Sequence, residues 1–254
     1  MSSKIGEGRI ARTIKVAASV VRQAINREMD IFMFATLEKP LPSSEIEEII
    51  YSGQCRRIHK WTHYPQIYER LFDCFKGTDV RFLEIGVFGG GSLDMWRSYL
   101  GPRANIHGVD INPACAELNT PETPVHIGSQ DDPDFMKSVV TQMGGLDVVL
   151  DDGSHIGRHQ RKSFEILWPL LREGGLYVIE DVHTSYWSSY EGGYRKRSTA
   201  IELAKELIDD MHGWYHHKDT ATPAQTEVGS VQVFDSIIAI EKRKRDRPAH
   251  IIVE

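Results

Sequence analysis

Two acidic clusters in the sequence have the residue types that metal-assisted chemistry requires. Asp151 and Asp152 open the segment DDGSH, and Glu180 and Asp181 open the segment EDVH. Four carboxylates brought together repel one another unless a positive charge lies between them. Oxygen ligands of this kind select a hard cation, and Mg²⁺ commonly binds a few carboxylates and keeps waters that a substrate can replace. The two clusters therefore predict a Mg²⁺ site, and Mn²⁺ accepts the same ligands.

His155 lies three residues after Asp152 and is the expected general base. A hydroxyl is a poor nucleophile at neutral pH, but a bound divalent ion lowers its pKa and a nearby base can take its proton. An imidazole suits this role because it titrates near neutrality. Two plainer interpretations compete. In the first, the acids have no metal to bind and merely cap helices or pair with Arg158 and Arg161. In the second, His155 is a buried, hydrogen-bonded loop histidine.

A glycine-rich segment, LEIGVFGGGS at residues 83–92, has the features of a ligand-binding loop. Glycines let the backbone turn sharply into a helix and approach a ligand closely. The spacing is not the dinucleotide fingerprint, because two bulky residues separate Gly86 from Gly89. Glu84, two residues before the first glycine, suits a cationic amino-acid ligand better than a pyrophosphate. Such a loop can also be no more than a turn.

Two further polar segments complete a candidate cofactor site. Asp110 ends the next predicted strand, about twenty residues after the glycines, where a carboxylate can accept both ribose hydroxyls of an adenosine. The segment GSQDD at residues 128–132 could read an adenine edge, or it could only cap the next helix. Together the three segments predict an S-adenosylmethionine site.

The elements that must position these residues alternate between strands and helices from Val80 onward. The expected strands are residues 81–85, 106–110, 125–127, 146–150 and 176–179, and the expected helices are residues 92–99, a short one after Pro113, 134–143 and 158–171. This alternation predicts an α/β fold with a parallel sheet covered on both faces. Residues 230–234 and 236–242 are two apolar strands close together, so at least one is expected to run antiparallel at the sheet edge.

Helical patterns precede residue 79. In residues 9–29 the apolar side chains recur every three or four positions, which predicts one stripe on a helix. Such a helix could dock on its own domain or on a second subunit, which would give a homodimer or a higher oligomer, and a membrane-surface helix is the alternative. Residues 44–50 predict a capped helix. We expect a helical N-terminal extension at residues 1–58 and the catalytic domain at 59–254.

Composition narrows the class of protein. The 254 residues carry 30 Lys and Arg against 36 Asp and Glu, a formal charge of −6, which argues against a general nucleic-acid binder. The three cysteines are scattered and are expected to be reduced thiols. No stretch has the roughly 18 to 20 apolar residues of a membrane helix. These features predict a cytoplasmic protein, with a transit peptide as the alternative.

Taken in order, the motifs LEIGVFGGGS, the acidic end of the second strand, GSQD, DDGSH and IEDVHTSYW resemble those of the metal-dependent sugar O-methyltransferases. This family includes macrolide-sugar 2-O-methyltransferases and relatives that act on bacterial glycolipids and polysaccharides. The similarity spans roughly residues 60–242, from KWTHYPQIYER to FDSIIAIEK. It implies a class I methyltransferase fold with a seven-stranded sheet, and it implies an S-adenosylmethionine-dependent O-methyltransferase.

The resemblance also implies roles for individual residues. It makes Asp152, Glu180 and Asp181 the metal ligands and His155 the base. The residues expected to hold or close over the cofactor are Lys60, Tyr64, Glu84, Gly86, Gly90, Ser92, Asp110, Gln130, Asp131 and Asp151. The residues expected to line the acceptor pocket are His183, Thr184, Tyr186, Trp187 and Tyr190, although aromatic residues beside a sheet are more often plain core.

The acceptor itself is left open by the sequence. The macrolide enzymes carry a substantial N-terminal domain, whereas only about 60 residues precede the shared region here. A saccharide of a bacterial polysaccharide or glycolipid, such as a mannose or rhamnose unit, is therefore at least as well supported as a natural-product glycoside. The alternatives are a catechol-type or other antibiotic-pathway hydroxyl, and a cofactor-binding interaction module without activity.

Overall fold

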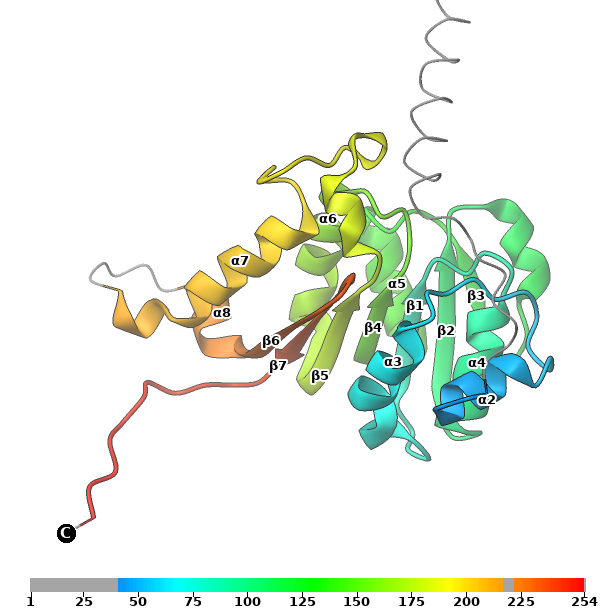
Figure 1. Cartoon of the computed structure of the whole chain (residues 1–254), viewed down its shortest axis with the longest axis horizontal. Coiled ribbons are helices and arrows are strands. Elements are labelled where there is room, and N and C mark those ends of the chain that lie inside the picture. The colour runs from blue at the N-terminus through cyan, green and yellow to red at the C-terminus, as the bar shows by residue number, and fades with distance from the viewer. Residues whose placement is uncertain (1–40, 217–221, 254) are drawn as a thin grey trace, which may run out of the picture.

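Short runs of aliphatic residues form the seven strands of one sheet, with the order β3-β2-β1-β4-β5-β7-β6 (Figure 1). The computed structural model describes residues 41–216 and 222–253. The strands are β1 (Arg81–Ile85), β2 (Asn105–Asp110), β3 (Val125–Ile127), β4 (Leu146–Asp151), β5 (Leu171–Ile179), β6 (Val228–Phe234) and β7 (Ile237–Lys242). Strands β1 to β5 pair in parallel, whereas β7 runs antiparallel to both β5 and β6. The predicted parallel sheet with an antiparallel strand near its edge is confirmed.

Helices cover both faces of the sheet (Figure 1). They are α2 (Glu45–Tyr51), α3 (Tyr64–Phe72), α4 (Gly91–Leu100), α5 (Pro133–Met143), α6 (Gly157–Leu167), α7 (Ala200–Met211) and α8 (Pro223–Glu227). Short 3₁₀ turns connect them at η1 (Asp73–Phe75), η2 (Pro113–Leu118), η3 (Trp168–Leu170), η4 (Val182–Tyr186), η5 (Ser188–Tyr190) and η6 (Gly213–Tyr215). One hydrophobic core lies between the sheet and α2, α3 and α4. A second lies between the opposite face and α5, α6 and α7.

Side chains along each strand alternate between these two cores, as the pleat requires. On β1, Phe82 packs toward α4 and Leu83 packs toward α5. On β4, Val148 and Leu150 face the α4 side, and Val149 faces the α5 side. This alternation decides which polar side chains at the strand ends can meet.

Two element boundaries differ by more than two residues from the sequence prediction. The helix expected over residues 158–171 ends at Leu167, because Pro169 lies in the following 3₁₀ turn and cannot continue an α-helical hydrogen-bond pattern. Strand β5 then begins at Leu171, earlier than expected. Helix α7 was not predicted, although Thr199 caps it by accepting a hydrogen bond from the amide of Glu202.

The N-terminal stripe at residues 9–29 lies outside the described residues. The oligomer predicted from this stripe therefore stays a prediction. The predicted helix at residues 44–50 is confirmed as α2, which Ser44 caps. Ile46 of α2 is fully buried in the core shared with α3 and α4. The division at residue 58 remains a prediction. Across the part of the chain that the structure describes, no helix is both long enough and apolar enough to cross a membrane.

Candidate active site

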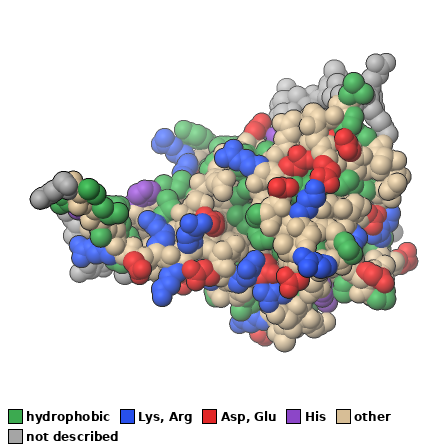
Figure 2. All heavy atoms as spheres, turned by 90° about the horizontal axis from the view of Figure 1, so that it is seen from below, with side chains coloured by type: hydrophobic (Ala, Val, Ile, Leu, Met, Phe, Trp, Pro, Cys, Tyr) green, Lys and Arg blue, Asp and Glu red, His purple; other side chains and the backbone are tan. Residues whose placement is uncertain are grey.

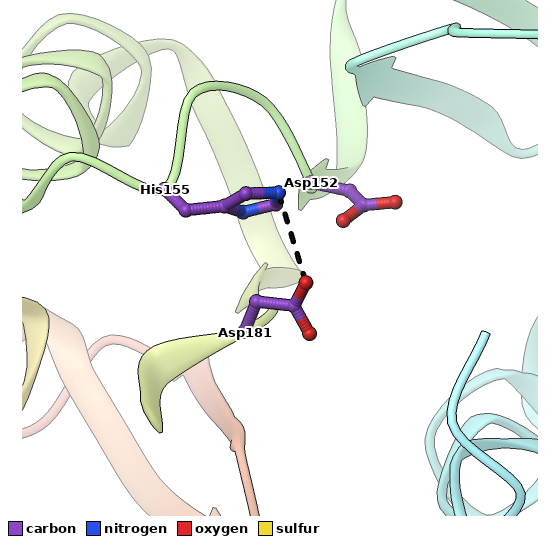
Figure 3. Close-up of side chains that lie close together, drawn as sticks. All are labelled: Asp152, His155 and Asp181. Atoms are coloured by element: carbon purple, nitrogen blue, oxygen red, sulfur yellow. Dashed lines mark ion pairs between the residues drawn. The ribbon is translucent and has the colours of Figure 1, made fainter. Parts of the chain in front are cut away.

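The two acidic clusters meet at the carboxyl ends of β4 and β5. One ligand atom each from Asp152, His155 and Asp181 lies within 4.8 Å of the other two (Figure 3). Strand pairing explains this, because Asp151 and Ile179 are register partners and the next residues leave the sheet side by side. His155 and Asp181 both have left-handed backbones, with φ of 56° and 52°. Non-glycine residues rarely adopt this conformation, and it concentrates at functional sites.

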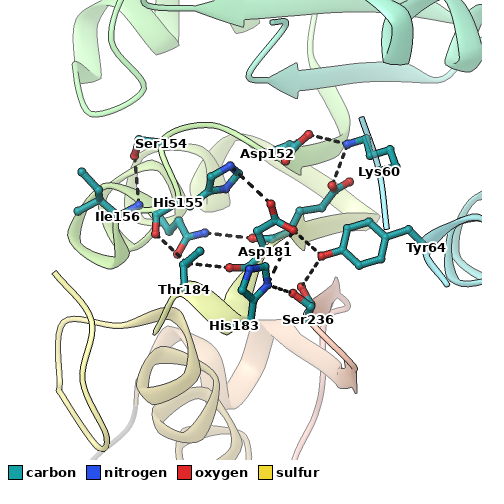
Figure 4. A network of polar contacts seen from close by, with 12 residues as sticks. Lys60, Tyr64, Asp152, Ser154, His155, Ile156, Asp181, His183, Thr184 and Ser236 are labelled. Carbon is teal, nitrogen blue, oxygen red and sulfur yellow. Dashed lines mark hydrogen bonds and ion pairs between the residues drawn. The ribbon is translucent and has the colours of Figure 1, made fainter. Parts of the chain in front are cut away.

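Lys60 supplies the positive charge that the carboxylates need. Its Nζ lies 2.5 Å from Asp152 Oδ2 and 2.8 Å from Glu180 Oε2 (Figure 4). Burial by itself would lower the pKa of Lys60, but the charges of Asp152, Glu180 and Glu84 hold this pKa above its ordinary value. The alternative, in which the acids pair with Arg158 and Arg161, is not found, because these arginines bind Glu191 and Glu206.

Helix α3 places two tyrosine hydroxyls on the same cluster. Tyr64 donates to Asp181 Oδ1 at 2.5 Å, and Tyr68 donates to Glu180 Oε1 at 2.6 Å. Both tyrosines are buried, and they lie four residues apart, so they project from one face of the helix. Glu180 therefore has both oxygens bonded within the protein, and burial together with Asp152 raises its pKa well above the ordinary value.

The glycine-rich segment forms the turn between β1 and α4. A Cβ on Gly86 would lie 2.0 Å from the carbonyl oxygen of Asp152, and Gly86 has a φ of 95°, so only glycine fits. Gly90 precedes the helix with a φ of 75°. Asp110 Oδ2 accepts the amides of Val87 at 2.9 Å and Phe88 at 3.0 Å. The β2 carboxylate thus fixes the shape of the glycine turn.

Glu84 is buried on the same face of the sheet as Lys60. Its Oε1 accepts a hydrogen bond from Trp96 Nε1 at 3.4 Å, whereas its Oε2 has no hydrogen-bond partner within the described residues. Burial raises the pKa of Glu84 to about 7, and the charge of Lys60 opposes this rise. A buried carboxylate oxygen without a donor is unfavourable, and a bound donor would relieve it.

Gln130 and Asp151 bond to each other on the opposite face of the sheet. Gln130 Nε2 donates to Asp151 Oδ1 at 3.0 Å, and Gln130 Oε1 accepts the amide of Ser154 at 2.9 Å. Ser163 and Tyr177 also donate to Asp151 Oδ2. This network holds the loop that carries His155. Asp131 accepts a hydrogen bond from the hydroxyl of Ser129, and its Oδ2 lies 3.8 Å from Nε2 of His159. Asp132 caps α5.

The predicted acceptor residues lie beside this cluster on the segment after β5. The ring of His183 contacts Trp187 edge to face at 4.6 Å between centroids, and the ring of Tyr190 lies 6.1 Å from that of His155. Thr184 donates to the carbonyls of His155 and Asp181, so this side chain joins the two strand-end loops. Tyr186 is exposed.

Sequence reasoning missed three residues that the structure places at the site. Tyr68 donates a hydrogen bond to Glu180. The ring of Trp61 packs edge to face on that of His183, with 5.5 Å between the ring centroids, and the hydroxyl of Ser236 hydrogen-bonds to His183 Nδ1. The four-residue spacing of Tyr64 and Tyr68 on a helix could have revealed the first. Ser236 lies in the β6–β7 turn, far from the other motifs in sequence, and nothing in the pattern indicated it.

Comparison with known proteins agrees with this geometry. Residues 83–182 match a family described as a methyltransferase domain. The chain is 38% identical to 8-demethyl-8-(2-methoxy-alpha-L-rhamnosyl)-tetracenomycin-C 3'-O-methyltransferase of Streptomyces olivaceus, over 85% of this chain and 57% of that protein. It is 34% identical to mycinamicin VI 2''-O-methyltransferase of Micromonospora griseorubida, over 80% of this chain and 53% of that protein. Over most of its length the chain is thus similar to sugar O-methyltransferases.

The fold agrees with this similarity. The solved structure of MycE methyltransferase in complex with Mg, SAH and mycinamycin VI superposes with a TM-score of 0.70 at 32% identity, covering 79% of this chain and 53% of that chain. The expected class I methyltransferase fold is therefore confirmed. The chain spans about half the length of the relatives it matches.

Proposed function

We propose that the chain is an S-adenosylmethionine-dependent and Mg²⁺-dependent O-methyltransferase that methylates a saccharide hydroxyl. The observation that carries this proposal is the convergence of Asp152, His155 and Asp181 beside the glycine turn of β1. Its relatives include enzymes that methylate sugars of natural-product glycosides. The similar MycE structure was determined with Mg and SAH.

The residues of the glycine turn fit the proposed cofactor. Glu84 Oε2 is buried and has no donor among the described residues, so it suits the ammonium group of the methionine part of the cofactor. Gly86 and Gly90 give the turn its left-handed backbone, and the missing Cβ of Gly86 lets the turn pack against the Asp152 carbonyl beside the proposed metal site. Asp110 accepts two amides of the turn through Oδ2, so it supports the binding loop, and the same carboxylate is the proposed partner of the ribose hydroxyls.

The carboxylate cluster fits a hard divalent cation. Asp152 and Asp181 offer oxygen atoms within 4.8 Å of each other, which matches the ligand type that Mg²⁺ prefers. Glu180, the third proposed ligand, is held by Lys60 and Tyr68, so its participation requires one of these contacts to lengthen. When bound, the ion would orient the acceptor hydroxyl and make it more acidic.

The proposed base is His155, through the Nε2 atom that faces Asp181 Oδ2 at 3.7 Å. Asp181 is held by the hydroxyl of Tyr64, and it can stabilise the imidazolium that forms when His155 takes the acceptor proton. The acceptor oxygen then bonds to the methyl carbon, the carbon–sulfur bond breaks, and S-adenosylhomocysteine leaves. The protein's main contribution is to hold donor and acceptor in line.

The acceptor surface consists of aromatic and polar side chains from η4 and η5. His183, Trp187 and Tyr190 lie along one side of the carboxylate cluster. Aromatic faces suit the apolar face of a pyranose ring. A glycan-bound or glycolipid-bound sugar and a natural-product glycoside remain the two candidate acceptor classes.

The test combines calorimetry with transfer assays. S-adenosylmethionine is titrated into the protein, and methyl transfer to a panel of saccharides and catechols is then followed with Mg²⁺ and with EDTA. We expect micromolar cofactor binding and transfer to saccharides that EDTA abolishes. Transfer that survives EDTA would remove the metal from the proposal, transfer to catechols alone would replace the acceptor class, and absence of cofactor binding would overturn the proposal.

A further inference from the structure

A loop beside the active site carries three consecutive cations, at residues 195–197. We name residues 194–197 the basic loop. It contains Tyr194, Arg195, Lys196 and Arg197, all of which are exposed. The chain as a whole has a charge of −6, and the only longer run of cations in the sequence, residues 242–245, lies at the end of β7 and beyond it. On the face seen in Figure 2, by contrast, basic and acidic side chains are interspersed.

The other cations near the basic loop are already neutralised. Arg158 binds Glu191 at 2.8 Å, and Arg161 binds Glu206 at 2.7 Å. Within residues 41–216 and 222–253, no carboxylate forms an ion pair with Arg195, Lys196 or Arg197. Lys196 contributes only a longer-range effect, since its charge helps to lower the pKa of Glu191. The loop therefore presents charge that the protein does not use for its own stability.

Backbone contacts hold the basic loop next to the catalytic histidine. Gly193, the residue before the loop, donates its amide to the carbonyl of Ser185 at 2.8 Å. At its end, the Arg197 carbonyl accepts from Arg161 at 2.9 Å. A Cβ on Gly157 would lie 2.4 Å from the Ser198 carbonyl oxygen, so the chain after the loop packs against the segment that follows His155. The basic loop is thus fixed at the rim of the proposed acceptor site.

The loop also places an aromatic ring beside its charges. The guanidinium of Arg195 lies 5.2 Å from the centre of the Tyr194 ring, and Arg195 has a left-handed backbone with a φ of 57°. This arrangement orients the planar guanidinium, which can bind a phosphate or carboxylate with two parallel hydrogen bonds. Tyr194 itself is 78% exposed and can contact a sugar ring.

We propose that the acceptor carries an anionic group, a phosphate or a carboxylate, close to the methylated sugar, and that the basic loop binds this group. The inference rests on the proposed function, because it assigns the neighbourhood of His155 to a saccharide. Among the possible acceptors, this inference favours an acidic glycan or a phosphate-linked saccharide over a neutral glycoside. Arg195, Lys196 and Arg197 determine specificity and have no part in the chemical step.

Binding is measured first, so that the result does not depend on turnover. Mannose 6-phosphate is compared with mannose, and glucuronic acid with glucose, by calorimetric titration in the presence of S-adenosylhomocysteine and Mg²⁺. We expect the anionic member of at least one pair to bind about tenfold more tightly, and this preference to shrink as salt rises from low to high concentration. The phosphate and carboxylate pairs distinguish the two sources of charge.

A triple variant tests the loop directly. In Arg195→Gln/Lys196→Gln/Arg197→Gln the preference for the anionic sugar should disappear, while the affinity for the neutral sugar stays unchanged. The matched control is Lys137→Gln/Lys205→Gln/Lys244→Gln, which removes three exposed positive charges elsewhere and should keep the preference. The variant Arg195→Lys/Arg197→Lys keeps the charge but not the planar guanidinium, so it should retain part of the preference, which separates a charge effect from misfolding of the loop.

Each result bears on one proposal. Equal affinity for the charged and neutral sugars, or equal loss in the loop variant and the control variant, would overturn the role of the basic loop. Methyl-transfer assays with the same sugars then test the function separately. Charge-selective binding without transfer to any hydroxyl acceptor would leave the loop's role standing and would reject the methyltransferase proposal.

Discussion

Lys60 Nζ lies 2.5 Å from Asp152 Oδ2, and the two residues are 92 positions apart in the sequence. The lysine comes from the segment before α3, and the aspartate follows β4. Only 6% of the Lys60 side chain is exposed, so the ammonium group is an internal counter-charge for Asp152 and Glu180. A lysine in this position substitutes for part of the charge that a divalent ion would bring.

Replacing this lysine should destabilise the metal-free protein. Lys60→Met leaves Asp152, Glu180 and Glu84 without their shared cation, and we expect the free energy of unfolding to fall by about 3 kcal/mol or more in urea titrations. Mg²⁺ should stabilise the variant more than the wild type, because it restores the missing charge. Lys205→Met, an exposed lysine, serves as the control. If both variants unfold alike, Lys60 has no such role.

The proposed base and metal ligand can be separated from cofactor binding. We expect His155→Ala to lower kcat about 10² to 10⁴-fold and to leave the Kd of S-adenosylmethionine nearly unchanged. Asp152→Ala should also remove turnover, and in addition it should abolish Mg²⁺ binding in calorimetry. His159→Ala, in the first turn of α6 directly after this loop, is the matched control for His155. A parallel loss of cofactor affinity and activity would reject these roles.

Asp110 should act through the glycine turn. Its carboxylate accepts amides from Val87 and Phe88 in the structure, so Asp110→Ala removes two hydrogen bonds that shape the cofactor loop. We expect about a tenfold weaker Kd for S-adenosylmethionine and a loss of about 1–2 kcal/mol in the free energy of unfolding. Asp134→Ala, an exposed acid in the first turn of α5, is the comparison. Unchanged cofactor affinity would contradict the prediction.

His107 makes the stability depend on pH away from the active site. Its Nδ1 lies 2.8 Å from Nε2 of His126, and burial, together with the charge of His126, lowers the pKa of His107 from about 6.5 to about 4. A histidine with a depressed folded pKa stabilises the fold above its unfolded pKa and loses that contribution as pH falls toward the folded pKa.

The wild type should therefore lose stability between pH 6.5 and 4 more steeply than His107→Gln, in which this position does not titrate. Chemical denaturation at a series of pH values measures the difference. His212→Gln, which replaces an exposed histidine, should follow the wild-type curve. Parallel pH profiles for His107→Gln and the wild type would show that burial of His107 is not linked to folding.

The sequence by itself determined most of the strands and helices, and also the edge of the sheet at which the candidate site lies. Alternating apolar runs and helical patterns locate β1 to β5, and the motifs after them must lie at one edge because parallel strands end together. Glu84, Asp110, Asp152 and Asp181 were found in this way. These predictions depend on local patterns, which a single sequence records directly.

Only the tertiary structure decided which of these side chains meet. Asp151 and Asp152 are adjacent in sequence, yet Asp151 bonds Gln130 and Ser163 on one side of the sheet and Asp152 bonds Lys60 on the other. Successive residues of a strand point to opposite faces, so the face that a strand-end acid occupies follows from the register of the sheet. The contacts of Lys60, Tyr68 and Ser236 depend on packing between distant segments, and no local pattern encodes that packing.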